Sequence, residues 1–246
     1  MSTHWPVIWH DSIDSTNEEA KRLASAPGFT DQWIVAREQT AGRGRLQREW
    51  KSPIGNLFNT ALFREPGGVE VAVRIPFAAA LATADVVGSF APNADIKLKW
   101  PNDVRIERAK VSGILIETGR QGETFWVAAG IGINVTHTPA GAGQQAVSIA
   151  ELRGDSAVTA EMVQQALREF LSARIEQART DFAATREDWL ARAEGLGETV
   201  RVKSVAEPVE GVFETLAEDC GLVLRLPDGE RRTIRAGDVS LIGDAG

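Results

Sequence analysis

The chain has 246 residues, of which 43% are hydrophobic and 25% are charged, which is typical of one large globular domain or of one domain with a small appendage. The formal net charge of −7 argues against a nucleic acid as the main partner, because nucleic-acid-binding domains are usually basic. The single cysteine, Cys220, excludes an internal disulfide and fits a reducing cytoplasm, where we place the protein. The N-terminus lacks the features of a secretory signal, and no apolar run suggests a membrane span, so we expect no membrane partner.

Hydrophobic periodicity predicts strands and helices over the first 195 residues. The first helix begins at Ser15 or Thr16, because each can act as a cap and each has a glutamate three residues later, and Pro27 ends it. The helix expected at 71–90 is dense in alanine and is predicted to be buried against a sheet. In chain order we expect strands at 7–10, 33–37, 56–63, 96–100, 103–107, 111–117 and 125–135, and further helices at 71–90, from the cap Thr159 through 171, and at 185–193.

The pattern changes at Gly195-Leu196-Gly197, beyond which short β runs replace helices. We expect strands at 200–205, 209–216, 222–226 and 230–235, with a hairpin turn at Asp228-Gly229. This tail of about fifty residues has the size of a small β-barrel, and Cys220 is predicted to lie in its core. We therefore divide the chain into a domain at 1–195 and a second domain at 196–246.

Residues 40–50 concentrate three arginines and an indole on a segment that contains two glycines. Glycine lets backbone N–H groups approach phosphate oxygens closely, and arginine binds such oxygens through two parallel hydrogen bonds. Trp50 can stack on a base. The segment therefore indicates a site for an anionic nucleotide, although a basic loop of this kind is equally compatible with a solvated turn.

A second unusual run is Lys99-Trp100-Pro101-Asn102-Asp103, followed seven residues later by Lys110. Together with the basic loop it suggests a site that holds an anionic nucleotide and activates a carboxylate. Such a site must bring two anions together, so fixed cations dominate its design. Lys110 is the first candidate for this role, and its alternative is a solvated lysine in a turn between two strands.

These two runs, in this order and spacing, resemble the catalytic domain of biotin–protein ligases. Further matching pieces are Asp14-Ser15-Thr16-Asn17, Gln39, Gly130-Ile131-Gly132-Ile133-Asn134 and the tail at 237–241, so the resemblance covers nearly the whole chain. It implies an α+β fold of the class II synthetase type, a mixed sheet flanked by helices, with a small C-terminal SH3-like β-barrel. It also implies that biotin and ATP with Mg²⁺ form biotinyl-5′-AMP, and that a biotin carboxyl carrier protein of acetyl-CoA carboxylase or a similar carboxylase receives the biotinyl group on a lysine.

The resemblance assigns roles to individual residues. Lys110 contacts both the biotin carboxylate and the α-phosphate, Arg43 and Arg45 lie in a loop that folds over the adenylate, and Arg48 meets the triphosphate or pyrophosphate. Asp103 orients the incoming lysine, helps to deprotonate it, or ligates Mg²⁺, and the sequence leaves these three alternatives open. The biotin site comprises Ser15, Thr16, Asn17, Gln39, Arg43, Lys110, Gly113 and Gly130, and the nucleotide site comprises Arg45, Arg48, Trp50, Asn102, Lys110, Gly132 and Asn134.

The chain departs from the family pattern at two loop positions. Gln47 stands where the family usually has glycine, and Leu46 where it often has a basic residue. A lipoate–protein ligase of the same fold and a non-enzymatic nucleotide-binding protein are the alternative functions. Because the first predicted strand begins at about Val7, we expect a ligase without a DNA-binding domain. We expect no permanently bound cofactor, and the sequence leaves a monomer and a homodimer open.

Overall fold

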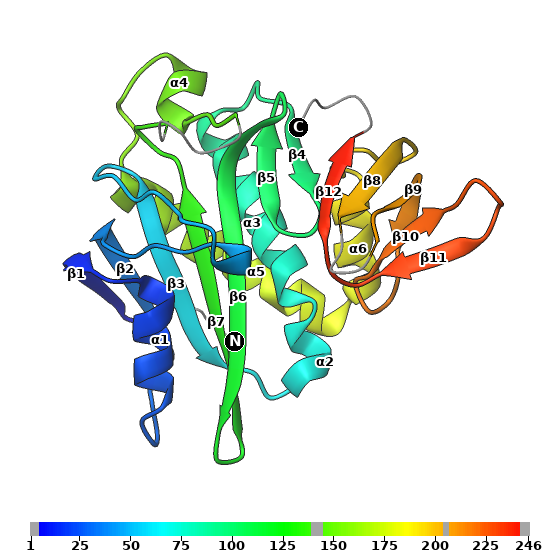
Figure 1. Ribbon diagram of the computed structural model, residues 1–246. Helices are drawn as coiled ribbons and strands as arrows, with labels where there is room; N and C mark the ends of the chain where they lie inside the picture. The colour runs from blue at the N-terminus through cyan, green and yellow to red at the C-terminus, as the bar shows by residue number, and fades with distance from the viewer. Residues whose placement is uncertain (1–4, 139–144, 204–206, 242–246) are drawn as a thin grey trace.

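The computed structural model describes residues 5–138, 145–203 and 207–241, and a seven-stranded mixed sheet forms its centre (Figure 1). Its strand order is β1-β2-β3-β7-β6-β5-β4, in which β1 and β2 are parallel and all other neighbours are antiparallel. The expected mixed sheet is therefore confirmed. The strands are β1 Val7–Ile13, β2 Gln32–Gln39, β3 Leu57–Arg64, β4 Ile96–Lys99, β5 Asp103–Ile106, β6 Ala109–Gln121 and β7 Thr124–Ile133.

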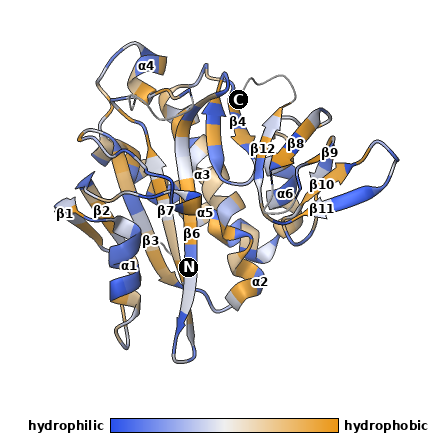
Figure 2. Cartoon of the chain, viewed as in Figure 1, coloured by the Kyte–Doolittle hydropathy of each residue, from blue (hydrophilic) through white to orange (hydrophobic). Residues whose placement is uncertain are grey.

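Helices cover both faces of this sheet, because successive strand residues point to opposite sides. On β2, Trp33 and Val35 pack with the large core under α3, α5 and α6, whereas Ile34 packs with Ala20 and Ala24 of α1. Figure 2 shows the hydrophilic residues of α1 and, by contrast, the hydrophobic strands that it covers. The helices are α1 Thr16–Ala24, α2 Gly68–Ala72, α3 Ile75–Phe90, α4 Ile149–Arg153, α5 Ala160–Thr180 and α6 Phe182–Leu190.

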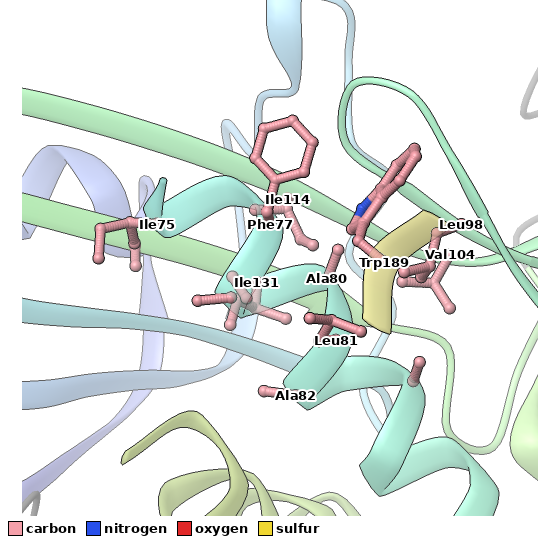
Figure 3. Close-up of a cluster of buried hydrophobic side chains, with 14 of the residues drawn as sticks. Ile75, Phe77, Ala80, Leu81, Ala82, Leu98, Val104, Ile114, Ile131 and Trp189 are labelled. Atoms are coloured by element: carbon pink, nitrogen blue, oxygen red, sulfur yellow. The ribbon is translucent and has the colours of Figure 1, made fainter. Parts of the chain in front are cut away.

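The large core is built around α3, which is buried on most of its sides (Figure 3). Ile75, Phe77 and Leu81 of this helix meet apolar side chains from β4, β5, β6 and β7, and Phe77 packs edge-on against Trp189 of α6 at 5.3 Å between ring centroids. Alanines at 78–80 let the helix approach the sheet closely. This core fixes the strands that carry the candidate site on their opposite face.

The expected helix at 71–90 is two helices, and the reason is Pro76. Proline lacks an N–H group and cannot continue a preceding helix, but it fits the first turn of a new one, where it lies in α3. From the sequence we also expected no apolar run as long as a membrane span. This expectation is wrong, because the segment Gly68–Phe90 is long enough and apolar enough to cross a membrane, judged by length and composition alone. However, 67% of its apolar window is buried inside the protein, as in a core helix.

The predicted capping box of α1 is not formed. Ser15 occupies the position before the helix, but its side chain makes no capping hydrogen bond. Instead Gln39 Oε1 accepts the backbone N–H of Thr16 at 2.9 Å. The side-chain cap at Thr159 is confirmed, since Thr159 accepts the backbone N–H of Met162. The hydroxyl group of Ser15 is thus available for another purpose, which the sequence left undecided, whereas that of Thr16 is bonded to Gln39 and Thr60.

The C-terminal part forms a separate antiparallel sheet of five strands in the order β11-β10-β9-β8-β12, consistent with an SH3-like domain. The domain boundary at 195/196 stays a prediction. Residues 192–194 pair with the outer edge of β4, and Trp100 Nε1 donates to the backbone oxygen of Cys220 at 3.3 Å, so the two parts are firmly connected. The strands are β8 Thr199–Lys203, β9 Val209–Leu216, β10 Leu222–Arg225, β11 Arg231–Ile234 and β12 Asp238–Leu241; residues 204 and 205 of the expected 200–205 strand lie outside the described part.

Cys220 provides a test of this packing. It is 7% exposed, and burial raises the pKa of its thiol to about 12. Because the thiolate is the nucleophile, we expect iodoacetamide at about pH 8 to modify the folded protein very slowly and the urea-unfolded protein rapidly. Intact-mass spectrometry measures the two rates, with Cys220→Ser as the control that gains no mass. Equal rates in both states would contradict the buried position.

Candidate active site

All fifteen residues assigned to the site from the sequence line one cavity of about 480 Å³. This volume lies within the range of small-molecule sites. The cavity crosses the sheet on the α1 face, from α1 and β2 over β7, β6 and β5 to β4, and β12 of the C-terminal domain closes its far end. The structure therefore brings together residues that are more than one hundred positions apart in the chain.

The α1 end of the cavity is a hydrogen-bonded polar network. Gln39 accepts from the Thr16 hydroxyl at 3.2 Å and donates to Ser52 at 3.1 Å. Thr60, which is fully buried on β3, has its hydroxyl 2.8 Å from that of Thr16. Ser15 is 4% exposed and lines the cavity, and no described residue forms a hydrogen bond with its hydroxyl. This end can therefore present a hydroxyl to a ligand and hold its neighbours rigid.

Asn17 has a different position from the one expected of a ligand-binding amide. Its Nδ2 donates both to the Leu115 backbone oxygen at 3.2 Å and to Glu117 at 2.9 Å, and its Oδ1 accepts from Thr60 at 2.6 Å. Both amide protons are consequently occupied by protein groups. We infer that Asn17 supports the polar network rather than donating to a ligand itself.

The centre of the cavity contains an ion pair between Lys110 and Asp103. The two charged atoms are 2.7 Å apart, and the side chains are 13% and 15% exposed. The ammonium also lies 5.1 Å from the centroid of the Trp50 ring. Asn102 braces the adjacent turn by donating to the Ile114 backbone oxygen at 2.8 Å. A largely desolvated ammonium held in one place in this way is suited to binding an anion.

The glycines of the cavity floor accommodate side chains of the protein. A Cβ on Gly132 would lie 2.7 Å from the Trp50 indole, and one on Gly113 would lie 2.8 Å from the same ring. A Cβ on Gly130 would collide with the amide of Asn17. The sequence predicted that these glycines let strands approach a ligand. In the structure their absent side chains make room for the indole and the amide that shape the cavity.

Asn134 terminates β7 and joins three segments. It is 2% exposed, and its Nδ2 donates to the backbone oxygens of Lys110 at 3.2 Å and Val147 at 3.1 Å. Its Oδ1 is buried and has no described partner. Asn134 therefore holds the backbone of Lys110 in place, while its Oδ1 is buried beside the cavity without a partner among the described residues.

The basic loop is folded over the cavity and is held at both ends by carboxylates. Arg43 pairs with Glu18 of α1, whereas Arg45 and Arg48 pair with Asp238 of β12 at 3.3 and 2.5 Å. Between these ends lies a short 3-10 helix, Arg45–Gln47. The loop thus connects the catalytic sheet with the C-terminal domain.

The two loop positions that depart from the family pattern have unusual backbone angles. Leu46 and Gln47 have φ values of 54° and 58°. A left-handed conformation costs a side-chain-bearing residue roughly 1–2 kcal/mol, which glycine avoids. The glycine that the resemblance leads us to expect at position 47 would adopt this conformation without that cost, whereas the present chain adopts it with glutamine.

Four residues of the site escaped the sequence analysis. Thr60 and Glu117 support Asn17, Asp238 binds the loop arginines, and Lys99 lines the cavity beside Asp103. Lys99 belongs to the run that drew attention to Asp103, and Asp238 lies in the tail at 237–241 that the resemblance included, so both positions were detectable, whereas Thr60 and Glu117 carried no local signal. Among the residues that the structure describes, no group of three or more His, Cys, Asp or Glu side chains is arranged to hold a metal ion.

Comparisons with known proteins agree over most of the chain. The model of the biotin/lipoate A/B protein ligase family matches residues 9–134, and that of the biotin protein ligase C-terminal domain matches residues 195–242. Biotin--[acetyl-CoA-carboxylase] ligase of Paracoccus denitrificans is 39% identical over 234 residues, which are 92% of this chain and 96% of the relative. The bifunctional ligase/repressor BirA of Bacillus subtilis is 27% identical over 96% of this chain and 74% of its own length.

A solved structure shows the same fold. Biotin protein ligase from Aquifex aeolicus, in complex with biotin and ATP, superposes with a TM-score of 0.80 at 27% sequence identity. The match covers 96% of this chain and 98% of that chain. The similarity therefore includes both the seven-stranded sheet and the C-terminal domain.

Thr60 allows the polar network to be tested separately from stability. Thr60→Val removes the hydroxyl that donates to Asn17, leaves that buried acceptor without its partner, and should cost about 1–3 kcal/mol of unfolding free energy. Because the network shapes the expected biotin end, we expect the KM for biotin to rise roughly tenfold.

Thr83→Val is the matched control, since Thr83 is equally buried but lies in α3, where its hydroxyl donates only to the Ala79 backbone oxygen. It should alter the urea unfolding curve without altering the KM. An unchanged KM in Thr60→Val, or an equal change in both variants, would contradict a role for the network in ligand binding.

Proposed function

The chain belongs to the biotin/lipoate A/B protein ligase family, and we propose that it activates biotin with ATP and transfers the biotinyl group to a lysine of a biotin carboxyl carrier protein. It is an ATP-dependent biotin ligase. The match of residues 195–242 to the C-terminal domain of biotin protein ligases favours this activity over lipoate ligation and over nucleotide binding without catalysis.

The observation that carries this proposal is the position of Lys110 at the centre of one continuous cavity. On one side lies the polar network of Thr16 and Gln39, and on the other side lie the loop arginines and Asp238. We assign the ureido ring of biotin to the polar end, because its donors and acceptor suit hydroxyls and amides. The biotin carboxylate then reaches Lys110, where it meets the α-phosphate of ATP.

In the first half-reaction a carboxylate oxygen of biotin attacks the α-phosphorus. A carbon–oxygen–phosphorus linkage forms, the bond from the α-phosphorus to the bridging oxygen breaks, and its electron pair leaves with pyrophosphate. The Lys110 ammonium reduces the repulsion between the two anions and stabilises charge on the α-phosphate oxygens. Asp103 holds this ammonium in place through the 2.7 Å ion pair.

The nucleotide base is assigned to the region of Trp50, Gly132 and Asn134. The indole lies against Gly132 and Gly113 and is assigned as the stacking surface, and the unpartnered Oδ1 of Asn134 is assigned as acceptor for an adenine amino group. Arg43 and Arg45 cover the adenylate and exclude water from its reactive carbonyl. The Mg²⁺ ion enters with ATP as part of the substrate, with most of its ligands supplied by phosphate oxygens and water.

In the second half-reaction the neutral amine of the carrier lysine attacks the carbonyl carbon of the adenylate and expels AMP. An ammonium is not nucleophilic, so a base must favour the neutral form. Asp103 is the carboxylate nearest to Lys110, and we assign it the orientation and deprotonation of the incoming lysine. Its pairing with Lys110 explains how one carboxylate serves both half-reactions.

We further propose that the protein works in the cytoplasm, without binding DNA, either alone or as a homodimer. The net charge of −7 disfavours binding to a polyanion. Strand β1 lies at one edge of the sheet, where a second copy has access to its backbone groups.

Lys110 gives the decisive test of the proposed function. Lys110→Ala should reduce biotin-dependent exchange of labelled pyrophosphate into ATP by roughly 100- to 1,000-fold, because it removes the central cation. Lys110→Arg should also be impaired, since a planar guanidinium cannot replace a compact ammonium at this distance from Asp103.

Lipoate serves as the parallel substrate, and the carrier domain of acetyl-CoA carboxylase serves as the acceptor in a streptavidin blot. We expect pyrophosphate exchange and biotinylation of the carrier domain when biotin is the substrate, and no pyrophosphate exchange when lipoate replaces it. Exchange with lipoate instead of biotin would move the protein to the other branch of its family, and exchange with neither would refute the proposed chemistry.

A further inference from the structure

Lys99 occupies a defined place in the cavity floor that the assignments above do not use. The registers of the sheet align Gly132, Gly113, Asp103 and Lys99 in one row across β7, β6, β5 and β4. Residues directly opposite one another in neighbouring strands point to the same face of a sheet. Lys99 therefore projects from the same face as Asp103, two strand spacings or roughly 10 Å beyond Gly113.

The cavity contains several cations, and Lys99 differs from those assigned above. Arg43 pairs with Glu18, Arg45 and Arg48 pair with Asp238, and Lys110 pairs with Asp103. By contrast, no described carboxylate lies within 4 Å of the Lys99 ammonium, and no hydrogen bond to it is found in the described part of the chain. A half-buried ammonium without a counterion favours the binding of an anion.

The electrostatic surroundings of Lys99 support this conclusion. Burial lowers the pKa of Lys99, and the nearby Arg105 lowers it further. The pKa of Lys99 is raised by three nearby carboxylates, those of Asp103, Glu194 and Asp238, but their effect is smaller than that of burial. The charged form of Lys99 is consequently less favourable in the protein than in water, and an anion beside it would relieve this cost.

We propose that Lys99 binds the β- and γ-phosphates of ATP and stabilises the pyrophosphate leaving group. The position follows from the row in the sheet, because Lys110 and Asp103 mark the α-phosphate and Lys99 is the next cation toward Arg45, Arg48 and the C-terminal domain. When the bond from the α-phosphorus breaks, its electron pair remains on the bridging oxygen of pyrophosphate. Lys99 stays protonated throughout and neutralises part of that charge.

This inference rests on the proposed function, and the two half-reactions separate it from other roles. Pyrophosphate takes part only in the first half-reaction. We expect Lys99→Met to slow single-turnover formation of biotinyl-5′-AMP by roughly 100-fold or more and to raise the KM for pyrophosphate in the reverse reaction at least about tenfold. Transfer from chemically prepared biotinyl-5′-AMP to the carrier domain should stay within about twofold of the wild type.

The variants are chosen so that misfolding cannot produce this pattern. Methionine replaces an ammonium whose charge is disfavoured by burial, so the melting temperature should not fall. Lys99→Arg keeps the positive charge and should recover most of the rate of adenylate formation. Lys97→Met is the matched control: Lys97 lies on the same strand, is 43% exposed, pairs with Asp95 at 3.2 Å, and should leave both half-reactions unchanged.

Three results would overturn the assignment of Lys99. These are adenylate formation at the wild-type rate in Lys99→Met, an equal loss in both half-reactions, and an equal effect of Lys97→Met. A wild-type protein that forms no biotinyl-5′-AMP would instead refute the proposed function itself, and with it this inference.

Discussion

Mutual repulsion among the cations around one cavity is the constraint on which the arrangement of the site depends. Arg43, Arg45, Arg48, Lys99 and Lys110 all line the same space, in a protein whose net charge is negative. The structure accommodates them by giving most of them a carboxylate partner from a different element: Glu18 from α1, Asp103 from β5 and Asp238 from β12. An incoming triphosphate can replace these carboxylates as counterion for several arginines at once. The positive charge is therefore kept in place before the substrate arrives, which is the preorganisation that electrostatic catalysis requires.

The sheet positions these charges because of its antiparallel register. Phe58, Gly132, Gly113, Asp103 and Lys99 form a continuous row across five strands, so side chains from distant parts of the sequence point to one face. Glycines at the centre of the row leave room for the Trp50 indole, and charged residues follow where the strands reach the C-terminal domain. The opposite face of the same strands is buried against α3, which prevents the row from shifting by a residue. The core and the site are thus two faces of one registered sheet.

Much of this architecture could be predicted from local patterns. The long buried strands β6 and β7 and the amphipathic helix α5 follow from their periodicity, and every residue assigned to the site lines the cavity. Two kinds of error remained. The capping box of α1 failed because Thr16 interacts with Gln39, which is 23 positions away; the resemblance placed both in one site, but local helix signals favoured the cap. Thr60 and Glu117 were missed because their importance depends entirely on long-range contacts, whereas Lys99 and Asp238 were missed although their segments were recognised.

The contacts of Asp238 and Trp100 also give the C-terminal domain a defined part in the chemistry. Asp238 holds Arg45 and Arg48 above the cavity, and Trp100, at the turn before Asn102 and Asp103, is anchored to the backbone of Cys220. Both contacts act on segments that carry catalytic groups, and neither can form within residues 1–195 alone. The loop also contains Leu46 and Gln47 in left-handed conformations, whose cost must be met by interactions elsewhere. The two ion pairs to Asp238 flank these residues directly, so the C-terminal domain stabilises the conformation of the loop in which Arg45 and Arg48 line the cavity.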